Sequence, residues 1–575
     1  MPVTITEPLL THRLDQQAHR YRMALIIVAA ALLYVAGSWC VSLWDRDEPW
    51  YCQTSRQMVQ SGDWVVPHFL DEPRCAKPIF IYWCQAASMT VFGTNPFAAR
   101  LVSALAMTVT LIVLSVTLSR AIGVRRAMLT LLIFATSAMV IASAKMCLTD
   151  SVLLVFITGM QFCLFRLYWM SRRRRSDSTL PTALLMWVLM GLAGLTKGPS
   201  ALILMLASMV FLAMMDVGGK VASLQAWRKA IGWWREVRFG RGLAIVLLIG
   251  LPWLVTAYLR DPAFVRQMLG EPGRHLASNQ DGHSMSPGYY LMTVWITYFP
   301  WSLFLPTTLV LAWKHRRLPH VRFALAIIAS NWLFQEMMVT KLPHYILPSF
   351  ASLAFLTSMA IIRCQRRQHD DLHRRTFAVA VAIWVCGALV GAALPLLGAI
   401  KFHNPSGLGA VLFAVVGAAY AGAAGVLLMR RRFSAAMALM GGGMVLLIAI
   451  LYLVYLPNAQ FLRLPERVGS FLRAQRAVGQ GQVVMIGYDE PSLAFYQGGT
   501  IRSKEKSYLR QVAPAEWPQW IVMTAKVFNS LPQDRKERLE RAASFSGVNY
   551  NTGGNVVDLW VMRKKDSNLL PTSEK

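Results

Sequence analysis

Acidic residues are scarce in this chain. Its 575 residues include 29 Asp and Glu against 58 Lys and Arg, and only 15% of all residues are charged. Soluble domains carry roughly 25% charged residues. Hydrophobic residues make up 55%, and many apolar stretches reach the ~20 residues needed to cross a ~30 Å hydrocarbon core. This composition excludes an ordinary soluble domain and predicts an α-helical polytopic membrane protein.

The chain also lacks several common functional signatures. Its eight cysteines form no CxxC pair and show no metal-ligand spacing. No nucleic-acid-binding motif accompanies the net charge of +29, and much of the positive excess falls in short loops between apolar segments. Such loops fix orientation and meet anionic lipid headgroups. We therefore expect membrane lipids and no nucleic acid as partners.

Lys and Arg gather in blocks between the apolar segments, and cytoplasmic loops of membrane proteins collect these residues. The blocks cover residues 125–126, 172–175, 220–241, 314–317, 363–375 and 430–432. They predict a cytoplasmic N-terminus and about thirteen spans in all. The first span is long and lacks a clear small-residue cleavage site, so we expect it to stay uncleaved. The predicted spans are 23–43, 97–119, 127–144, 152–170, 181–196, 200–215, 243–259, 290–313, 321–340, 344–362, 376–399, 408–429 and 434–456.

A change in composition after the last span divides the chain into two predicted domains, and the odd number of spans places the second one outside. Residues 1–456 form a transmembrane catalytic domain, with a long first external loop at 44–96. Within that loop, residues 79–93 are short for a crossing and follow a proline, so we interpret them as an interfacial helix. Residues 457–575 form a small external α/β domain, in which 466–478 and 531–543 are the predicted helices.

Unusual carboxylates follow two of the spans at their external ends. Asp45, Asp47 and Glu48 lie in DRDEPWY, and Asp150 ends KMCLTD. Clustered carboxylates raise one another's pKa or are held apart by a cation, and either arrangement suits a general base or a ligand. The alternatives are a solvated loop for the first group, and a helix cap or an ion pair with Lys145 for Asp150.

Cationic side chains occur at the same predicted boundary. Lys77 precedes an apolar helix and suits a lipid phosphate, although a lysine there can also snorkel. Arg274 offers a planar guanidinium that fits phosphate oxygens in pairs. Lys197, in LTKGPS, more often marks a turn than a site. Three residues of the 260–289 loop form a weak candidate set for a divalent metal: Glu271, His275 and His283.

TKLPHY places three polar side chains of different chemistry between two predicted spans. Lys341, His344 and Tyr345 would all lie at one membrane depth, where polar groups are costly unless they are used or hydrated. An ion pair between Glu336 and Lys341 is the structural alternative. The cysteines of the first external loop, Cys52 and Cys75, leave open whether a disulfide joins them.

These strings, in this order, resemble the lipid-dependent glycosyltransferases of the C-type membrane fold. Within that group they are most similar to the dolichyl-phosphate-mannose protein mannosyltransferase-like family, whose bacterial members include aminoarabinose transferases of lipid A. The matching strings are DE at 47–48, KPI at 77–79, FAARLVSAL at 97–105, TD at 149–150, LTKGP at 195–199 and TKLPHY at 340–345. Relatives often carry Glu where this chain has Ala76, which weakens any metal site built there.

The resemblance implies transfer of 4-amino-4-deoxy-L-arabinose from undecaprenyl phosphate to a lipid A phosphate, on the periplasmic face of the bacterial inner membrane. Asp47 would act as a base or would position substrate groups, with Glu48 and Asp150 as further catalytic candidates. Lys77 and Arg274 would hold the donor phosphate. The substrate pocket would be lined by Tyr345, His344, Lys341, Tyr51 and Tyr82. No cofactor is certain, a divalent metal stays open, and a monomer is expected.

Two other functions are compatible with parts of the pattern. Within the same class, the sugar could go to protein or to another glycolipid. A lipid transporter is the rival from a different class. Transporters place polar groups near the bilayer midplane and show repeated halves. This chain gathers its polar motifs at one boundary and shows no internal repeat, which favours the transferase.

Overall fold

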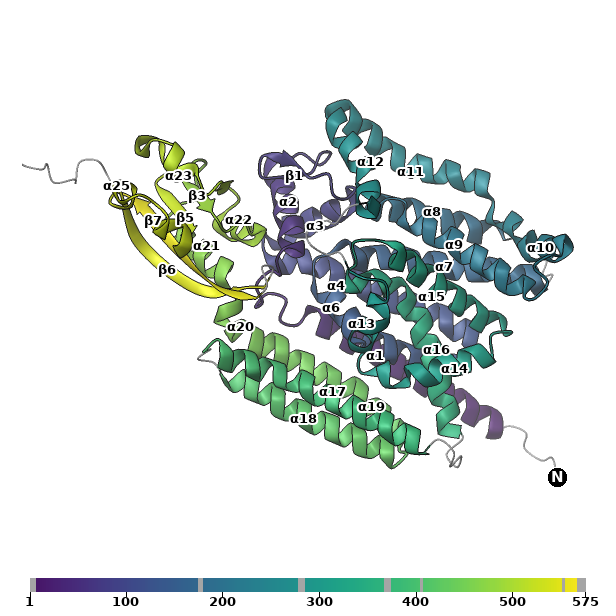
Figure 1. Cartoon of the computed structure of the whole chain (residues 1–575). Helices are drawn as coiled ribbons and strands as arrows, with labels where there is room; N and C mark the ends of the chain where they lie inside the picture. The colour runs from purple at the N-terminus through teal and green to yellow at the C-terminus, as the bar shows by residue number, and fades with distance from the viewer. Residues whose placement is uncertain are drawn as a thin grey trace, which may run out of the picture.

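The computed structural model describes residues 7–173, 179–277, 285–366, 374–403, 407–550 and 554–565. Long helices pack side by side, and a small β-sheet stands at one end of the bundle (Figure 1). The predicted fold class, a polytopic helical protein with a small α/β unit at its C-terminal end, is therefore confirmed.

The helical part runs from α1 to α20. Its helices are α1 (Glu7–Val35), α2 (Asp47–Ser61), α3 (Phe80–Phe92), α4 (Pro96–Ile122), α5 (Val124–Ala135), α6 (Ala138–Lys145), α7 (Thr149–Arg173), α8 (Leu180–Lys197), α9 (Ser200–Val217), α10 (Leu224–Ile231), α11 (Phe239–Arg260), α12 (Pro262–Ala277), α13 (Tyr289–Thr297), α14 (Leu305–Lys314), α15 (Pro319–Met337), α16 (Phe350–Arg366), α17 (Arg374–Lys401), α18 (Gly407–Met429), α19 (Phe433–Ile450) and α20 (Leu456–Asn458). Short 3-10 turns intervene at η1 (Gly232–Val237), η2 (Trp301–Phe304), η3 (Pro343–Ser349) and η6 (Gln460–Leu462), and a π-helical turn, η5 (Leu451–Tyr455), follows α19.

Ten helices of the described residues are long and apolar enough to cross a membrane, or eleven if the bent pair α5 and α6 counts as one span. These eleven correspond to eleven of the thirteen predicted spans. The other two differ in the structure. Predicted span 290–313 is divided into α13 and α14 at Pro300, and span 321–340 is α15, whose last turns carry Gln335 and Glu336. The count of thirteen therefore stays a prediction.

The first predicted external loop folds into compact structure at the sheet end of the bundle. It contains α2, the antiparallel pair β1 (His68–Phe69) and β2 (Glu72–Pro73), and α3. With 13 residues, α3 is about 20 Å long, too short for a ~30 Å hydrocarbon core. In Figure 1, α2, β1 and α3 lie between the helical bundle and the sheet, whereas α10 lies at the opposite end. This arrangement agrees with the predicted interfacial helix.

The C-terminal unit is a five-stranded sheet of order β4-β3-β5-β7-β6. Its strands are β3 (Val483–Ile486), β4 (Arg502–Lys504), β5 (Trp520–Thr524), β6 (Leu539–Asn549) and β7 (Asn555–Lys564). β3 pairs in parallel with β4 and β5, and β7 pairs antiparallel with β5 and β6. The helices of this unit are α21 (Leu464–Ala474), α22 (Pro491–Gln497), α23 (Tyr508–Gln511), α24 (Ala525–Asn529) and α25 (Gln533–Lys536), with the 3-10 turn η7 (Pro514–Glu516).

One helix predicted for this unit is wrong. Residues 531–543 contain helix-forming Arg, Glu and Leu, but only α25 is helical there, and β6 begins at Leu539. Pairing along β7 and burial of one face override the local helix propensity, which is a weak determinant on its own. The predicted helix at 466–478 is confirmed as α21.

Candidate active site

The two neighbouring carboxylates of the DE pair, at the start of α2, lie in different environments. Glu48 is fully buried, and the Arg100 guanidinium binds both its oxygens, with Nε–Oε1 and Nη2–Oε2 distances of 2.8 and 2.5 Å. The backbone N–H groups of Trp44 and Cys147 donate to the same carboxylate at 2.8 and 2.9 Å. With both oxygens occupied inside the protein, Glu48 has a structural role. Its contacts do not support the catalytic role that the sequence predicted.

Arg100 links this carboxylate to the connection between α1 and α2. Its guanidinium also donates to the carbonyl oxygens of Ser38, Val41 and Ser42, at 3.0, 2.6 and 2.8 Å. Arg100 itself is placed by α4, which begins at Pro96 and is capped by the Asn95 side chain. The buried pair therefore holds the end of α1, the start of α2 and α4 in one fixed arrangement.

Asp47, by contrast, is exposed, and among the described residues no hydrogen bond or ion pair engages its carboxylate. Asp45 differs again, because the C-terminal unit binds it. The Ser492 backbone N–H donates to its Oδ1 at 3.0 Å, and the Ser492 hydroxyl donates to its Oδ2. Of the three acidic side chains in DRDEPWY, Asp47 alone is left available for a substrate.

Burial governs the electrostatics of Asp45. Desolvation raises the pKa of its carboxyl to about 8, while the hydrogen bonds from Ser492 lower it and the nearby Glu490 carboxylate raises it further. Tyr550 accepts a hydrogen bond from the Asp45 backbone N–H at 2.7 Å. Asp45 is thus part of the contact between α2 and the C-terminal unit.

Asp150, at the start of α7, lies in a second polar cluster. Its Oδ1 is 2.8 Å from the Lys197 ammonium, and its Oδ2 is 3.5 Å from His344 Nε2. The Lys197 ammonium also lies over the Tyr345 ring, 4.5 Å from its centroid. The alternative partner that the sequence suggested for Asp150, Lys145, instead donates to the Ala36 carbonyl at 2.6 Å.

Local backbone features bring these groups together. Lys197 is the last residue of α8, which ends because Gly198 takes a left-handed φ of 63°. Pro343 opens the short turn η3, which carries His344 and Tyr345 at the entrance to α16. Three separate helix ends therefore meet at Asp150.

The cations and tyrosines of the first loop extend the cluster. Burial lowers the pKa of Lys77 to about 8, assisted by the nearby Lys197 and Arg74 charges and opposed by Asp150 and Glu271. Tyr51 and Tyr82 lie with ring centroids 5.9 Å apart. Burial raises the pKa of Tyr82 to about 12, and the Arg74 guanidinium beside it acts in the opposite direction.

The residues of the first loop and the cluster around Asp150 influence one another electrostatically. Burial raises the Tyr51 pKa, and the charges of Tyr82 and Asp47 raise it further. The His344 imidazole, which belongs to the Asp150 cluster, lies within the electrostatic influence of Asp47 and Lys77 in the first loop. The structure therefore links seven of the predicted site residues into one cluster: Asp47, Lys77, Asp150, His344, Tyr345, Tyr51 and Tyr82.

Lys341 is not part of this cluster's reactive groups. It is buried, and its ammonium donates to the carbonyl oxygens of Met285 and Met338 at 3.0 and 2.6 Å. Glu336, its suggested partner, accepts hydrogen bonds from the backbone N–H groups of Gly288 and Tyr290, both at 3.1 Å. Lys341 thus stabilises the loop before η3, and its contacts do not support the predicted substrate-binding role.

The residues predicted from the 260–289 loop are only partly covered. The side chains of Arg274 and His275, and all of His283, lie outside the described residues. Glu271 is described and acts electrostatically on Lys77. Within the described ranges, no group of three His, Cys, Asp or Glu side chains has an arrangement that could hold a metal ion. The predicted phosphate role of Arg274 and the metal set stay predictions.

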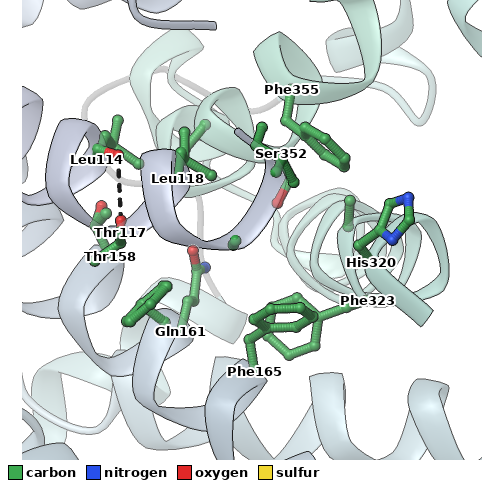
Figure 2. Close-up of a pocket in the computed structure, with 15 residues that line it drawn as sticks. Leu114, Thr117, Leu118, Thr158, Gln161, Phe165, His320, Phe323, Ser352 and Phe355 are labelled. Carbon is green, nitrogen blue, oxygen red and sulfur yellow. Dashed lines mark hydrogen bonds between the residues drawn. The ribbon is translucent and has the colours of Figure 1, made fainter. Parts of the chain in front are cut away.

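A cavity elsewhere in the bundle does not belong to this site. It lies between α4, α7, α15 and α16 and is lined mainly by apolar side chains, with Gln161 and His320 among the few polar groups (Figure 2). Leu118, on its wall, is about 27 Å along α4 from Arg100 at 1.5 Å per residue. None of the predicted site residues lines this cavity.

Three residues important to the site were missed or undervalued by sequence reasoning. Lys197 was interpreted as a turn residue, although its ion pair with Asp150 anchors the cluster. Arg74 was not considered, and its guanidinium stacks on Trp50 at 4.2 Å while its buried Nε has no hydrogen-bond partner among the described residues. Arg100 lies inside the FAARLVSAL string, where a charge in an apolar run is itself a signal of a buried partner.

Comparison with known proteins finds a protein family whose members resemble the part of the chain that carries this site. Residues 20–266, which include α2, Lys77, Asp150 and Lys197, match the family described as dolichyl-phosphate-mannose-protein mannosyltransferase. The chain carries a domain of this family. The family predicted from the sequence strings is thereby confirmed.

Several relatives carry one name, undecaprenyl phosphate-alpha-4-amino-4-deoxy-L-arabinose arabinosyl transferase. The protein from Pseudomonas paraeruginosa is 30% identical over 369 residues, covering 62% of this chain and 62% of the relative. The protein from Photorhabdus laumondii is 28% identical over 392 residues, covering 67% of each. The chain thus spans about three fifths to two thirds of the length of the relatives it matches.

The fold likeness extends over nearly the whole chain. The crystal structure of ArnT from Cupriavidus metallidurans bound to undecaprenyl phosphate superimposes with a TM-score of 0.73, covering 96% of this chain and 99% of that one, at 20% identity. The same protein in its apo state gives a TM-score of 0.71. These matches establish the shared fold, including the C-terminal unit.

Proposed function

We propose that this protein transfers 4-amino-4-deoxy-L-arabinose from undecaprenyl phosphate to a phosphate of lipid A, at the periplasmic face of the bacterial inner membrane. The observation that carries the proposal is one polar cluster, in which His344 lies within the electrostatic influence of the uncommitted Asp47 carboxylate, of Lys77 and of the Asp150–Lys197 pair. The names of the relatives supply the substrates, and the cluster supplies the groups that such a transfer needs.

The donor's leaving group is a polyprenyl phosphate, which departs more easily when cations neutralise its developing charge. Lys77 and Arg74 provide two such cations at one wall of the site. The Arg74 Nε, which has no hydrogen-bond partner among the described residues, offers a donor beside them. Arg274 would complete this phosphate site from α12, as the resemblance implies.

Asp47 acts on the acceptor side of the reaction. With an acceptor hydroxyl it would take the proton, a contribution typically worth about 10²–10⁴-fold. A lipid A phosphate is already nucleophilic at neutral pH, so with that acceptor Asp47 orients the sugar or binds its ammonium group. The new bond forms at the anomeric carbon as the bond to the polyprenyl phosphate breaks.

Asp150 and Lys197 keep the substrate pocket in shape. The Asp150 Oδ2 lies 3.5 Å from His344 Nε2, and the Lys197 ammonium lies over the Tyr345 ring. The Tyr345 and Tyr51 rings supply flat surfaces for a sugar, and His344 supplies a polar edge. Transfer of a different sugar to protein or to another glycolipid would use the same donor machinery, so the acceptor is decided by experiment.

The test expresses the chain in a Gram-negative strain that lacks its own aminoarabinose transferase but makes the lipid-linked sugar. Mass spectra of lipid A should show an added aminopentose with the wild-type protein. Asp47→Asn should abolish this species while membrane insertion stays normal. Glu72→Gln is the matched control, because Glu72 is also an exposed acidic residue of the first loop with no hydrogen bond or ion pair of its carboxylate among the described residues, and it should leave the added mass in place.

Unmodified lipid A with the inserted wild-type protein would reject the proposed acceptor or donor. Release of undecaprenyl phosphate without lipid A modification would favour transfer to protein or another glycolipid. Movement of the intact lipid-linked sugar across the membrane, with no transfer, would favour the transporter.

A further inference from the structure

Two cysteines from distant parts of the chain have their sulfur atoms in contact. Cys52, in the second turn of α2, lies with its Sγ 3.3 Å from the Sγ of Cys147, in the connection between α6 and α7. Both side chains are fully buried. Sequence reasoning considered a bond between Cys52 and Cys75 instead, but the Cys75 thiol points to the Gln267 side-chain oxygen, 3.1 Å away.

The surrounding framework fixes this proximity independently of the thiols. The Cys147 backbone N–H donates to Glu48 Oε1 at 2.9 Å, and Glu48 is held by Arg100. The connection before α7 is therefore attached to the first turn of α2, one turn away from Cys52. Thiols are weak hydrogen-bond donors and acceptors, so an S–H···S contact adds little to this arrangement.

We propose that Cys52 and Cys147 form a disulfide bond in the protein as it exists in the cell. The inference rests on the proposed periplasmic placement of this face, and it does not depend on the sugar or the acceptor. Disulfides form and persist in the bacterial periplasm. No other pair of sulfur atoms among the described cysteines is in such contact.

The bond forms by thiol–disulfide exchange with a disulfide-carrying protein oxidant, before the two segments close over the thiols. The Cys52 thiolate attacks one sulfur of the oxidant's disulfide, that S–S bond breaks, and the other oxidant sulfur leaves as a thiolate. The Cys147 thiolate then attacks Cys52 Sγ and releases the second oxidant sulfur. The oxidant gains two electrons and, with the two protons from the cysteines, becomes a dithiol.

The bond would join the helix that begins at Asp47 to the connection directly before the helix that carries Asp150. It would fix the distance between the two carboxylate-bearing segments of the site, in addition to the buried Glu48–Arg100 pair. It would also close a loop across α3, α4, α5 and α6, which restricts the unfolded chain and stabilises the folded one.

The experiment maps the thiols of the full-length wild-type protein. Cells are quenched with acid, the protein is denatured without reductant, and free thiols are alkylated before digestion and mass spectrometry. The proposal predicts that two of the eight cysteines escape alkylation and that one peptide pair, carrying Cys52 and Cys147, is linked. Eight alkylated cysteines, or a linked pair of different composition, would overturn it.

Two variants sharpen the result without relying on activity. Cys147→Ser should free Cys52 for alkylation, and the thermal midpoint in detergent should then become insensitive to reductant. Cys75→Ser, the matched control, should keep the linked peptide and the reductant-dependent fall in midpoint. A wild-type midpoint that reductant leaves unchanged, together with complete alkylation, would contradict the proposal even if lipid A transfer is normal.

Discussion

The clearest quantitative prediction concerns Glu48, which the sequence placed in the active site and the structure places in the core. Its carboxylate accepts two charge-assisted bonds from Arg100 and two bonds from backbone N–H groups. Glu48→Gln keeps the size of the side chain, but its amide nitrogen then faces donors, and the guanidinium stays buried without a counter-charge.

Breaking a buried ion pair from one side costs about 3–5 kcal/mol. We therefore expect Glu48→Gln to lower the free energy of unfolding by about that amount, measured by denaturant titration of the protein in detergent micelles. Glu72→Gln is the control, since Glu72 is exposed on β2 and exposed substitutions change stability by at most about 0.5 kcal/mol.

The pattern of loss distinguishes the two interpretations of this residue. A structural Glu48 predicts lower stability and less folded protein, with near-normal transfer activity for each folded molecule. Normal unfolding free energy combined with lost transfer would refute the structural role and restore the catalytic role predicted from the sequence.

The remaining predictions concern pH and the second polar cluster. Affinity for undecaprenyl phosphate should fall above pH 8 as Lys77 loses its proton. Lys77→Arg should remove this fall because arginine stays charged. If the variant keeps the wild-type pH profile, the fall in affinity belongs to another group. The folded-state pKa of Asp45, about 8, lies above its ordinary value of 3.8, so the fold favours the protonated form. Unfolding free energy should therefore fall as pH rises from about 4 to about 8 and then level off, and Asp45→Asn should remove that slope. Asp150→Asn and Lys197→Met should each lower kcat/KM about 10²-fold, with the double variant no worse than either, because the pair acts as a unit; additive losses in steady-state assays would contradict this.

Much of the fold was predictable because composition and charge placement are strong signals in membrane proteins. Apolar length marks the spans, and Lys and Arg blocks mark their ends. The prediction was less accurate where the structure breaks the pattern. Pro300 divides one expected span into α13 and α14, and α15 carries too many polar groups to pass as a simple apolar span.

The site was predictable at the level of which strings matter, and less so at the level of which side chain does what. Asp47 and Glu48 are adjacent and chemically alike, and only the three-dimensional contact with Arg100 separates their roles. For the two lysines, the sequence favoured Lys341 as the site residue and Lys197 as a turn residue, and the contacts of the two side chains indicate the opposite. The first binds backbone carbonyls, and the second is at the centre of the polar cluster. Local sequence does not show where a long side chain ends.

The most direct test of the account asks whether separate segments of the chain share one aqueous face. Single cysteines are placed at Asp47, Lys77, Glu271 and Tyr345, in a background that keeps Cys52 and Cys147 and replaces the other six. A membrane-impermeant maleimide added from the periplasmic side should label all four positions, and undecaprenyl phosphate should slow the labelling. Labelling of any one of them only from the cytoplasmic side would contradict the account.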